Sequence, residues 1–205
     1  MSDQAPRLGV LISGRGSNLQ AIHQAIADGR LHARIAIVIG NRPEAAGLAW
    51  ARDAGLETMC LDHRQFRDRH TYDRALADTL QARTLDLICL AGFMRLLGDP
   101  LLSAFPHRIL NIHPSLLPSF PGLDAQQQAL EHGVKITGAT VHFVTPELDA
   151  GPIVLQAAVP VHDDDTIERL SARILVEEHR IYPEAIGIVL AGRHTFHARR
   201  FVRLP

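Results

Sequence analysis

The alternation of apolar runs with helix-patterned segments is the sequence feature that most constrains the fold. In the first half of the chain, four short apolar runs are typical of buried strands, at residues 8–12, 35–39, 57–61 and 85–91. Between these runs, apolar residues recur at the spacing of one helix face, at residues 18–27, 45–54 and 66–82. This order predicts an α/β fold with a mostly parallel twisted sheet and helices on both of its faces.

The second half of the chain has a less regular pattern. A Pro-rich loop, residues 113–122, follows a short predicted strand. The expected elements are strands at 108–112, 140–144 and 153–161, helices at 125–132 and 166–191, and an edge strand within 194–204. Because no repeat or linker divides the chain, we expect a single domain over residues 1–205.

Charge and composition exclude several classes of protein. Lys and Arg number 21 and Asp and Glu number 22, so the net charge of -1 leaves no basic surplus for nucleic acid. No run approaches the roughly 18 apolar residues of a membrane span, and residues 1–6 contain no apolar signal-peptide core. Cys60 and Cys89 both lie in apolar runs, which predicts reduced, buried thiols. We therefore expect a cytoplasmic protein without a membrane or nucleic-acid partner.

The first candidate site is the glycine-containing turn after the first predicted strand, residues 13–18. Its glycines permit close approach of the backbone to a ligand, and a helix start offers free N–H groups to an anion. Gly16, Ser17 and Asn18 are therefore candidates for binding phosphate. The alternative is an ordinary turn in which Ser17 or Asn18 caps the helix. Leu19 replaces the third glycine of a dinucleotide fingerprint, so this turn does not predict a dinucleotide site.

The second candidate site is the pair Asn111 and His113. Side chains repeat every two residues along a strand, so both point to the same side of the sheet. An amide donor can stabilise an oxyanion while an imidazole moves protons. The alternative is a strand-end Asn and His that satisfy the Pro-rich loop after them.

Asp149, in the loop before Gly151, is the third candidate. A carboxylate close to His113 would hold one tautomer of the imidazole. The alternative is a solvated acid in a turn. His113 and His142 show no metal-ligand spacing, so we expect no metal. The basic residues of the tail are interpreted as a solvated edge, at Arg199, Arg200 and Arg203.

Five segments, in this order and spacing, resemble the 10-formyltetrahydrofolate-dependent formyltransferases over nearly the whole chain. They are the glycine-containing turn and residues 91–95, 111–118, 141–144 and 147–152. Residues 16–19, Gly-Ser-Asn-Leu, resemble the branch of this family that acts on glycinamide ribonucleotide. The resemblance implies a Rossmann-like fold and an enzyme of purine biosynthesis. It also implies a phosphosugar-binding half, residues 1–105, and a folate-binding and catalytic half, residues 106–205.

The reaction that this resemblance implies is formyl transfer from 10-formyltetrahydrofolate, a cosubstrate, to the primary amine of glycinamide ribonucleotide. Asn111 would stabilise the oxygen of a tetrahedral intermediate. His113 would move protons, directly or through a water, and Asp149 would orient His113. No metal would be needed, because both substrates are held in place.

The resemblance also implies substrate contacts. Gly16, Ser17 and Asn18 are expected to hold the ribonucleotide phosphate, and Glu178 to accept from a ribose hydroxyl. The alternative for Glu178 is an exposed acid on a helix. The residues expected to bind the folate are Arg69, Met94, Arg95, Leu96, Leu97, Asn111, Thr145 and Asp149. The peptide bond between Leu117 and Pro118 is expected to be cis.

The chain departs from the family pattern after Gly122. Many relatives carry a His where this chain has Asp124, and a His-Arg-Gln pattern where it has Gln126, Gln127 and Gln128. These departures affect the loop contacts expected near the folate.

Three other functions compete with this interpretation. A 10-formyltetrahydrofolate hydrolase would use the same side chains with water as the acceptor, but such enzymes usually carry an N-terminal domain before the strand that begins here by Leu8. A methionyl-tRNA formyltransferase would need an added RNA-binding domain and a basic surplus. A phosphosugar-binding module without catalysis would leave Asn111 and His113 without a purpose. The oligomeric state, including a homodimer, is left open.

Overall fold

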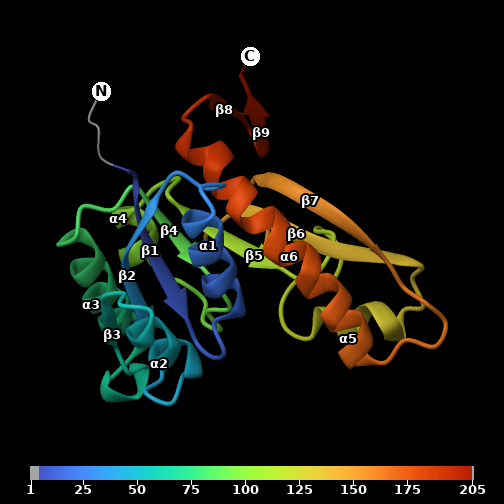
Figure 1. Ribbon diagram of the computed structural model, residues 1–205, viewed down its shortest axis with the longest axis horizontal. Helices are drawn as coiled ribbons and strands as arrows, with labels where there is room; N and C mark the ends of the chain where they lie inside the picture. The colour runs from blue at the N-terminus through green and yellow to red at the C-terminus, as the bar shows by residue number, and fades with distance from the viewer. Residues whose placement is uncertain (1–4, 205) are drawn as a thin grey trace. The chain divides into compact units, whose positions relative to one another are not determined.

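The computed structural model describes residues 5–204, and the chain divides into two compact units, residues 1–110 and 111–205 (Figure 1). Strands and helices alternate in the first unit, as the sequence predicts. Its elements are β1 (Arg7–Ile12), α1 (Ser17–Ala27), β2 (Arg34–Gly40), α2 (Ala46–Asp53), β3 (Thr58–Cys60), η1 (His63–Gln65), α3 (Arg69–Gln81), β4 (Leu87–Leu90) and α4 (Asp99–Ala104). The strands lie in the order β3-β2-β1-β4, and all of these pairs are parallel.

The core of the first unit explains why its strands are continuous apolar runs. β1 is buried from Leu8 onward, and α1 packs its Leu19, Ile22 and Ala25 inward. A parallel strand covered on both faces has no side exposed to water, so every position favours an apolar side chain. Helices from the intervening segments supply that cover, and the turns at the carboxyl ends of the strands are left for ligands.

Helix α3 begins later than the predicted segment 66–82. Asp68 is its N-cap, and the carboxylate accepts a hydrogen bond from the backbone N–H of Thr71 at 2.8 Å. Thr71 returns a hydrogen bond to the cap, which completes a capping box. Phe66 is extended and lies before the helix. The short elements η1 and α4 were not predicted, because three to six residues are too few to show a helical repeat.

One prediction about the cysteines is wrong. Cys89, in strand β4, is buried, but Cys60 is an exposed free thiol. β3 contains only three residues and lies at the edge of the strand order, so its last side chain is left open to solvent.

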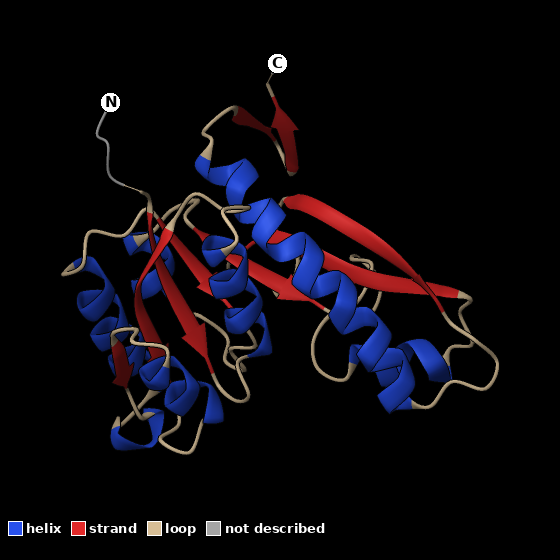
Figure 2. Ribbon diagram, in the orientation of Figure 1, coloured by secondary structure: helices blue, strands red, loops and turns tan. Residues whose placement is uncertain are grey.

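The second unit has a different architecture (Figure 2). Its elements are β5 (Ile109–His113), which starts at the end of the first unit, α5 (Ala125–Glu131), β6 (Ile136–Phe143), β7 (Ile153–Pro160), α6 (Ile167–Leu190), β8 (His194–His197) and β9 (Arg200–Arg203). The strand order is β5-β6-β7-β9-β8. β6 and β7 form a long antiparallel hairpin, β9 pairs with β7 in parallel, and β8 pairs with β9 antiparallel.

Two strand predictions in this unit need correction. β6 begins at Ile136, earlier than the predicted residue 140, and includes Gly138, where a Cβ would lie 1.9 Å from the carbonyl oxygen of Ala157. The tail forms two strands rather than one edge strand, because Ala198 adopts a left-handed φ of +53° and reverses the chain. Within residues 5–204, none of the helices combines the length and apolar character that crossing a membrane requires.

Candidate active site

Strand β5 ends at the two side chains on which the candidate site depends. Asn111 and His113 lie two residues apart on this strand, so they share one side of it, and His113 is buried. The loop after the strand fixes the His113 ring, since Nε2 lies 2.8 Å from the carbonyl oxygen of Phe120. A carbonyl oxygen only accepts hydrogen bonds, so Nε2 carries the proton, and Nδ1 of the neutral ring is left as an acceptor.

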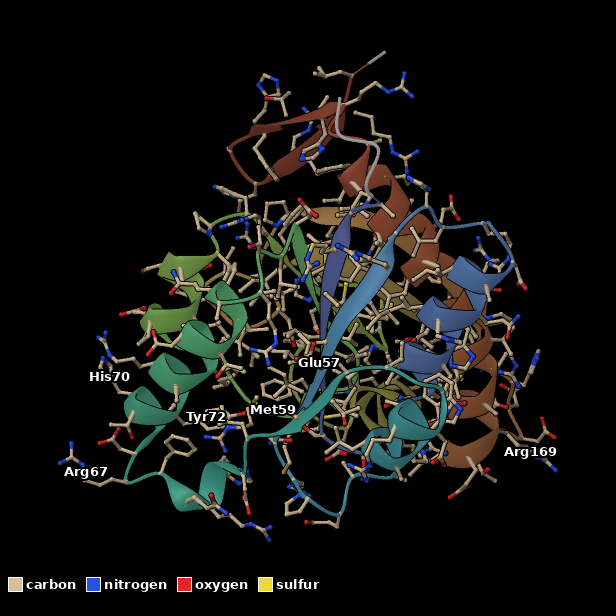
Figure 3. All side chains as sticks on the ribbon, turned by 60° about the vertical axis from the view of Figure 1, so that its left-hand side comes forward. Glu57, Met59, Arg67, His70, Tyr72 and Arg169 are labelled. Atoms are coloured by element: carbon tan, nitrogen blue, oxygen red, sulfur yellow. The ribbon has the colours of Figure 1, made fainter. Side chains whose placement is uncertain are left out.

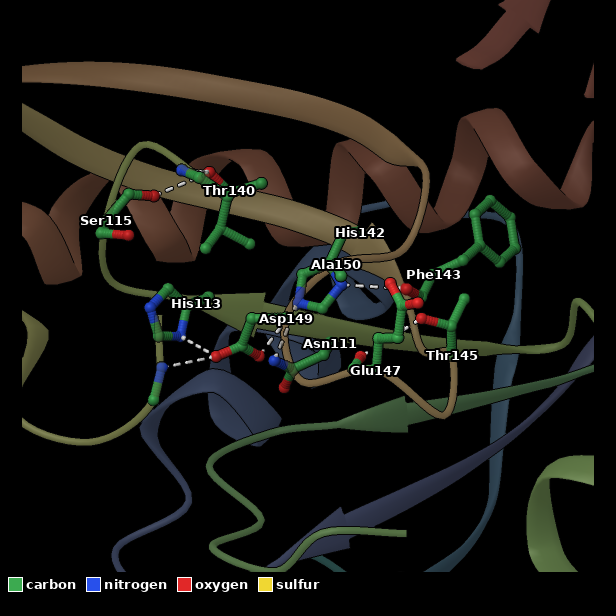
Figure 4. Close-up of polar contacts among 12 residues, drawn as sticks. Asn111, His113, Ser115, Thr140, His142, Phe143, Thr145, Glu147, Asp149 and Ala150 are labelled. Carbon is green, nitrogen blue, oxygen red and sulfur yellow. Dashed lines mark hydrogen bonds and ion pairs between the residues drawn. The ribbon is translucent and has the colours of Figure 1, made fainter. Parts of the chain in front are cut away.

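The structure places Asp149 beside that second ring nitrogen (Figure 4). Oδ2 of Asp149 lies 3.5 Å from Nδ1 of His113, and the Asp149 side chain is only 10% exposed. The backbone N–H of Gly122 donates to the same carboxylate oxygen at 2.8 Å. A carboxylate at this position stabilises the imidazolium that forms when Nδ1 takes up a proton. The carboxylate and the ring thus face each other in a position that is largely shielded from water.

The placement of Asp149 follows from the loop that joins β6 to β7. Asp149 has a φ of +48°, in the left-handed region that Asp adopts more readily than most residues. A Cβ on Gly151 would lie 1.8 Å from the carbonyl oxygen of Phe143, so only glycine fits at this position. The backbone N–H of Phe143 donates to the carbonyl oxygen of Pro152 at 2.9 Å and closes the loop. These constraints hold the carboxylate beside β5.

His142 of β6 belongs to this cluster. From the sequence alone, this residue is a candidate only as a metal ligand. It is 2% exposed. Nδ1 of His142 donates to the carbonyl oxygen of Phe143 at 2.9 Å, so Nε2 is the acceptor for Nδ2 of Asn111 at 3.1 Å. Nε2 also lies 3.6 Å from Oδ1 of Asp149. The signal in the sequence is a single imidazole within an otherwise apolar, buried strand end.

The protonation state of His142 determines how the Asn111 amide is held. Burial lowers the pKa of His142, because desolvation disfavours the charged ring, and the nearby His113 adds to this shift. The Phe143 carbonyl and the Asp149 carboxylate oppose it. The neutral ring accepts one N–H of Asn111 Nδ2, and the second N–H of that amide nitrogen is suited to a substrate oxygen.

In the first unit, the turn between β1 and α1 has the geometry of an anion site. The N-cap of α1 is Gly16, whose φ is +74° and which has no side chain to cap the helix. Ser17 and Asn18 lie inside the helix, so neither is the N-cap residue of the alternative interpretation. Helix N-termini without such a cap present backbone N–H groups to an anion.

Gly47 of α2 supports this turn from the other side. Its backbone N–H donates to the carbonyl oxygen of Gly14 at 3.0 Å. A Cβ on Gly47 would lie 3.1 Å from Cα of Gly16 and 2.7 Å from Cδ1 of Ile12. The two backbones approach so closely that a side chain at either glycine would displace the turn.

The segment after β4, residues 94–98, is held by α3. Nη2 of Arg69 donates to the carbonyl oxygen of Leu97 at 2.7 Å, and the N–H of Gly98 donates to Oδ2 of Asp73 at 2.7 Å. Nε of Arg69 lies 3.5 Å from that same oxygen. Burial raises the pKa of Asp73. Arg69 is therefore an anchor for this segment and not only a surface charge.

The side chains of this segment differ in exposure. Met94 and Leu96 are 65% and 56% exposed, whereas Leu97 is buried. The guanidinium of Arg95 lies 4.9 Å from the ring centroid of Tyr72. Figure 3 shows Tyr72 directed inward from α3, in contrast to the outward His70. Two large apolar side chains are thus presented to solvent on an anchored backbone.

Comparison with known proteins decides the family. A model of the formyl transferase family matches residues 6–186. The chain belongs to the formyl transferase family. It is 46% identical over 188 residues to phosphoribosylglycinamide formyltransferase of Escherichia coli. The match covers 92% of this chain and 89% of that protein. The formyltransferase family that the sequence resembles is thereby confirmed.

Another relative is the trifunctional purine biosynthetic protein adenosine-3 of Bos taurus, 47% identical over 186 residues. The match covers 91% of this chain, which spans only 18% of the length of that longer protein.

Solved structures of formyl transferase relatives agree with the predicted fold. Glycinamide ribonucleotide transformylase 1 from Symbiobacterium toebii superposes with a TM-score of 0.97 at 56% identity, covering 100% of this chain and 96% of that chain. The predicted α/β fold with a mostly parallel sheet flanked by helices is confirmed. A formyltetrahydrofolate deformylase from Pseudomonas syringae has a TM-score of 0.91 at 28% identity, covering 99% of this chain and 67% of that chain. The fold alone therefore does not separate a transferase from a hydrolase.

Two further positions implied by the formyl transferase resemblance lie in the second unit. Glu178 of α6 is 8% exposed, so it is not the exposed helix acid of the alternative interpretation. Thr145 is half-buried, and its hydroxyl donates to the carbonyl oxygen of Glu147 at 3.2 Å. Within the described part of the chain, no three His, Cys, Asp or Glu side chains form a group that would hold a metal ion.

The loop that departs from the family pattern binds its own backbone. Asp124, with a φ of +56°, precedes α5. Gln128 donates to the carbonyl oxygens of Leu123 at 2.8 Å and Pro121 at 3.4 Å. The predicted cis peptide bond between residues 117 and 118 is present. Gln128, the glutamine that this chain shares with the His-Arg-Gln pattern, therefore has a structural role in the loop.

Proposed function

We propose that this chain transfers the formyl group of 10-formyltetrahydrofolate to the primary amine of glycinamide ribonucleotide, a step of purine biosynthesis. The observation that carries the proposal is the cluster of Asn111, His113 and Asp149, which unites an amide donor, an imidazole and a carboxylate. Identity to proteins named phosphoribosylglycinamide formyltransferase supports the choice of acceptor. The proposal assigns phosphosugar binding to residues 1–105 and folate binding and catalysis to residues 106–205, apart from folate contacts at Arg69 and residues 94–97.

The chemistry requires one bond to form and one to break. The amine nitrogen attacks the formyl carbon, and the carbonyl electron pair moves onto oxygen to give a tetrahedral intermediate. The bond from that carbon to N10 then breaks as the carbonyl re-forms. The attacking nitrogen loses a proton and N10 gains one, so no proton is consumed overall.

Asn111 is proposed to stabilise the oxygen of the intermediate. His142 holds one N–H of its amide nitrogen, and this contact fixes the direction of the second. A donor that is oriented before the reaction needs no rearrangement when charge develops. Loss of such a donor typically raises the barrier by ~2.7–4 kcal/mol.

His113 and Asp149 are proposed to carry the proton from the amine to N10. Nε2 of His113 is engaged by the Phe120 carbonyl, so direct transfer at Nε2 requires that hydrogen bond to break. Transfer through a water to the pair formed by Nδ1 and Asp149 requires no such change, and we assign this route. Proton handling of this kind contributes roughly 10²–10⁴-fold to the rate.

Substrate contacts follow from the same proposal. The backbone at Gly16, Ser17 and Asn18 would bind the ribonucleotide phosphate, and the uncapped start of α1 supports this role. Glu178 would accept from a ribose hydroxyl. The residues proposed to bind the folate are Arg69, Met94, Arg95, Leu96, Leu97, Asn111, Thr145 and Asp149.

Hydrolysis of 10-formyltetrahydrofolate is the second candidate function. The same three side chains would activate a water in place of the amine, and the similarity to a formyltetrahydrofolate deformylase structure favours this alternative. Higher identity to transformylases supports the transferase.

A single assay separates these functions. Purified protein is incubated with 10-formyltetrahydrofolate, with and without glycinamide ribonucleotide, and both tetrahydrofolate and formylated product are measured. The proposal predicts tetrahydrofolate only when the amine is present, in equal amount to the formylated product. Release of formate that is independent of the amine would establish the hydrolase. No folate product in either mixture would leave only a binding module.

A cytoplasmic location and activity without a metal stay predictions, and the sequence makes no choice of oligomeric state. Of these, the metal is the simplest to test. Dialysis against a chelator is expected to leave formyl transfer unchanged, whereas loss of activity that zinc or magnesium restores would contradict a metal-free mechanism.

A further inference from the structure

We propose that the C-terminal hairpin of β8 and β9 positions the loop that carries Asp149, and that Arg199 is the positioning residue. The inference rests on the proposed function of Asp149. The hairpin lies outside residues 6–186, which the family model matches. The sequence predicts a solvated edge for its basic residues, but one of them, Arg199, makes a specific hydrogen bond.

Arg199 contacts the backbone immediately after Asp149. Its Nη2 donates to the carbonyl oxygen of Ala150. The next residue, Arg200, pairs with Ile153 at the start of β7, so the turn of the hairpin is fixed beside the end of this loop. Asp149 itself is in a left-handed conformation, which is sparsely populated even for Asp and is stabilised by its surroundings. A hydrogen bond at the following carbonyl is one such constraint.

The aromatic side of the hairpin contacts the other end of the loop. The ring centroid of Phe143 lies 5.1 Å from that of Phe196 and 5.9 Å from that of Phe201. The carbonyl oxygen of Phe143 accepts the hydrogen bond from His142 Nδ1. Figure 4 shows Phe143 and Ala150 next to the residues that they position, His142 and Asp149. The hairpin therefore supports both ends of the loop, through packing at one end and a hydrogen bond at the other.

The exposure of Arg199 makes a substitution informative. The side chain lies at the surface, so its removal leaves no cavity in a core. Lys at this position keeps the charge and can donate to the same carbonyl oxygen, which separates the hydrogen bond from the mere presence of an arginine. Arg203, at the end of β9 in the same hairpin and also exposed, supplies a control with the same change in charge.

The test compares Arg199→Ala, Arg199→Lys and Arg203→Ala in the full chain. We expect Arg199→Ala to lower kcat roughly 10- to 100-fold, the effect of a small misplacement of a catalytic group, while KM for the ribonucleotide stays near the parent value. Arg199→Lys should recover most of kcat, and Arg203→Ala should match the parent. Melting temperatures should agree among all four proteins. The NMR signals of the His142 imidazole should shift in Arg199→Ala alone.

Several results would overturn the proposal. They are an unchanged kcat in Arg199→Ala, an equal loss in Arg203→Ala, and a loss of kcat that only follows a lowered melting temperature. Failure of the proposed function is distinguishable, because the parent would then show no formyl transfer. The imidazole signals of His142 would still report whether Arg199 positions the loop, since they do not depend on activity.

Discussion

The two units of this chain form their candidate sites from different chemical groups. The first unit uses backbone, because its candidate phosphate turn depends on Gly16 and on the close approach of Gly47. The second unit uses buried side chains, because Asn111, His113 and Asp149 supply the reactive groups of its cluster. Backbone N–H groups suit the binding of a fixed charge, whereas titratable side chains are needed to move protons. Under the proposed function, phosphate binding and proton transfer are therefore separated along the chain.

The largest effect is expected when the proposed proton carriers of the second unit are removed. His113→Ala and Asp149→Asn are each expected to lower kcat roughly 10²–10⁴-fold, because proton transfer then falls to solvent. KM for the ribonucleotide should change little. Steady-state kinetics checks this, with the exposed His162→Ala as the control. Near-parent kcat in either variant would remove that residue from the mechanism.

A second test concerns the amide donor. Asn111→Ala should raise the barrier by ~2.7–4 kcal/mol through loss of the donor to the developing oxyanion. Asn111→Asp keeps the shape of the side chain but lacks the N–H groups, so its rate of formyl transfer should fall as far as that of Asn111→Ala. Single-turnover rates measure both variants. A rate in Asn111→Asp close to that of the parent would show that an N–H donor is not required.

The first unit should respond in binding instead. Gly47→Ala forces a Cβ against Cδ1 of Ile12 and Cα of Gly16 and displaces the phosphate turn. Overpacking of this kind costs on the order of 1–3 kcal/mol, so KM for the ribonucleotide should rise about tenfold with kcat retained. Ala49→Ser, on the exposed face of the same helix, is the control. A fall in kcat with unchanged KM would contradict the separation of the two roles.

The smallest expected effect is on stability against pH. Burial lowers the pKa of three histidines in the second unit, His142, His179 and His194. As pH falls below their ordinary value of 6.5, the unfolded chain takes up protons before the folded chain does. The free energy of unfolding should therefore decrease from about pH 7.5 to about pH 5.5.

In the first unit, burial shifts a pKa in the opposite direction. Burial raises the pKa of Asp73, so its folded form takes up a proton first, and stability from this group is lost as pH rises through that raised pKa. Urea unfolding at the two pH values checks the histidine prediction, and replacing His194 by Gln should flatten the dependence. An equal free energy of unfolding at both pH values would contradict it.

The fold of the first unit is largely predictable from its sequence. Parallel strands buried on both faces must be continuous apolar runs, and these runs lie close to β1, β2, β3 and β4. The start of β6 is not predictable in this way. Thr137 and Gly138 interrupt the apolar pattern, and their place in the strand depends on the partner β7, which the local sequence does not specify.

The site is predictable only in part. Alternation along one strand is sufficient to predict that Asn111 and His113 share a side. The approach of Asp149 depends on its own left-handed φ and on the close passage of Gly151 past a carbonyl oxygen, which are features of the folded loop. The role of His142 depends on a tautomer that the Phe143 carbonyl selects. Contacts of this kind arise from tertiary structure, and a single sequence does not encode them as a local pattern.

The central claim is that His113 and Asp149 act as one proton-carrying unit, and a double-mutant cycle tests it most directly. Formyl transfer in single turnovers is measured for the parent, His113→Ala, Asp149→Asn and the double variant. Residues that act as a unit have strongly non-additive effects, so the double variant should be no slower than His113→Ala alone. Losses that multiply in the double variant would show that the two side chains act independently, and would contradict the account.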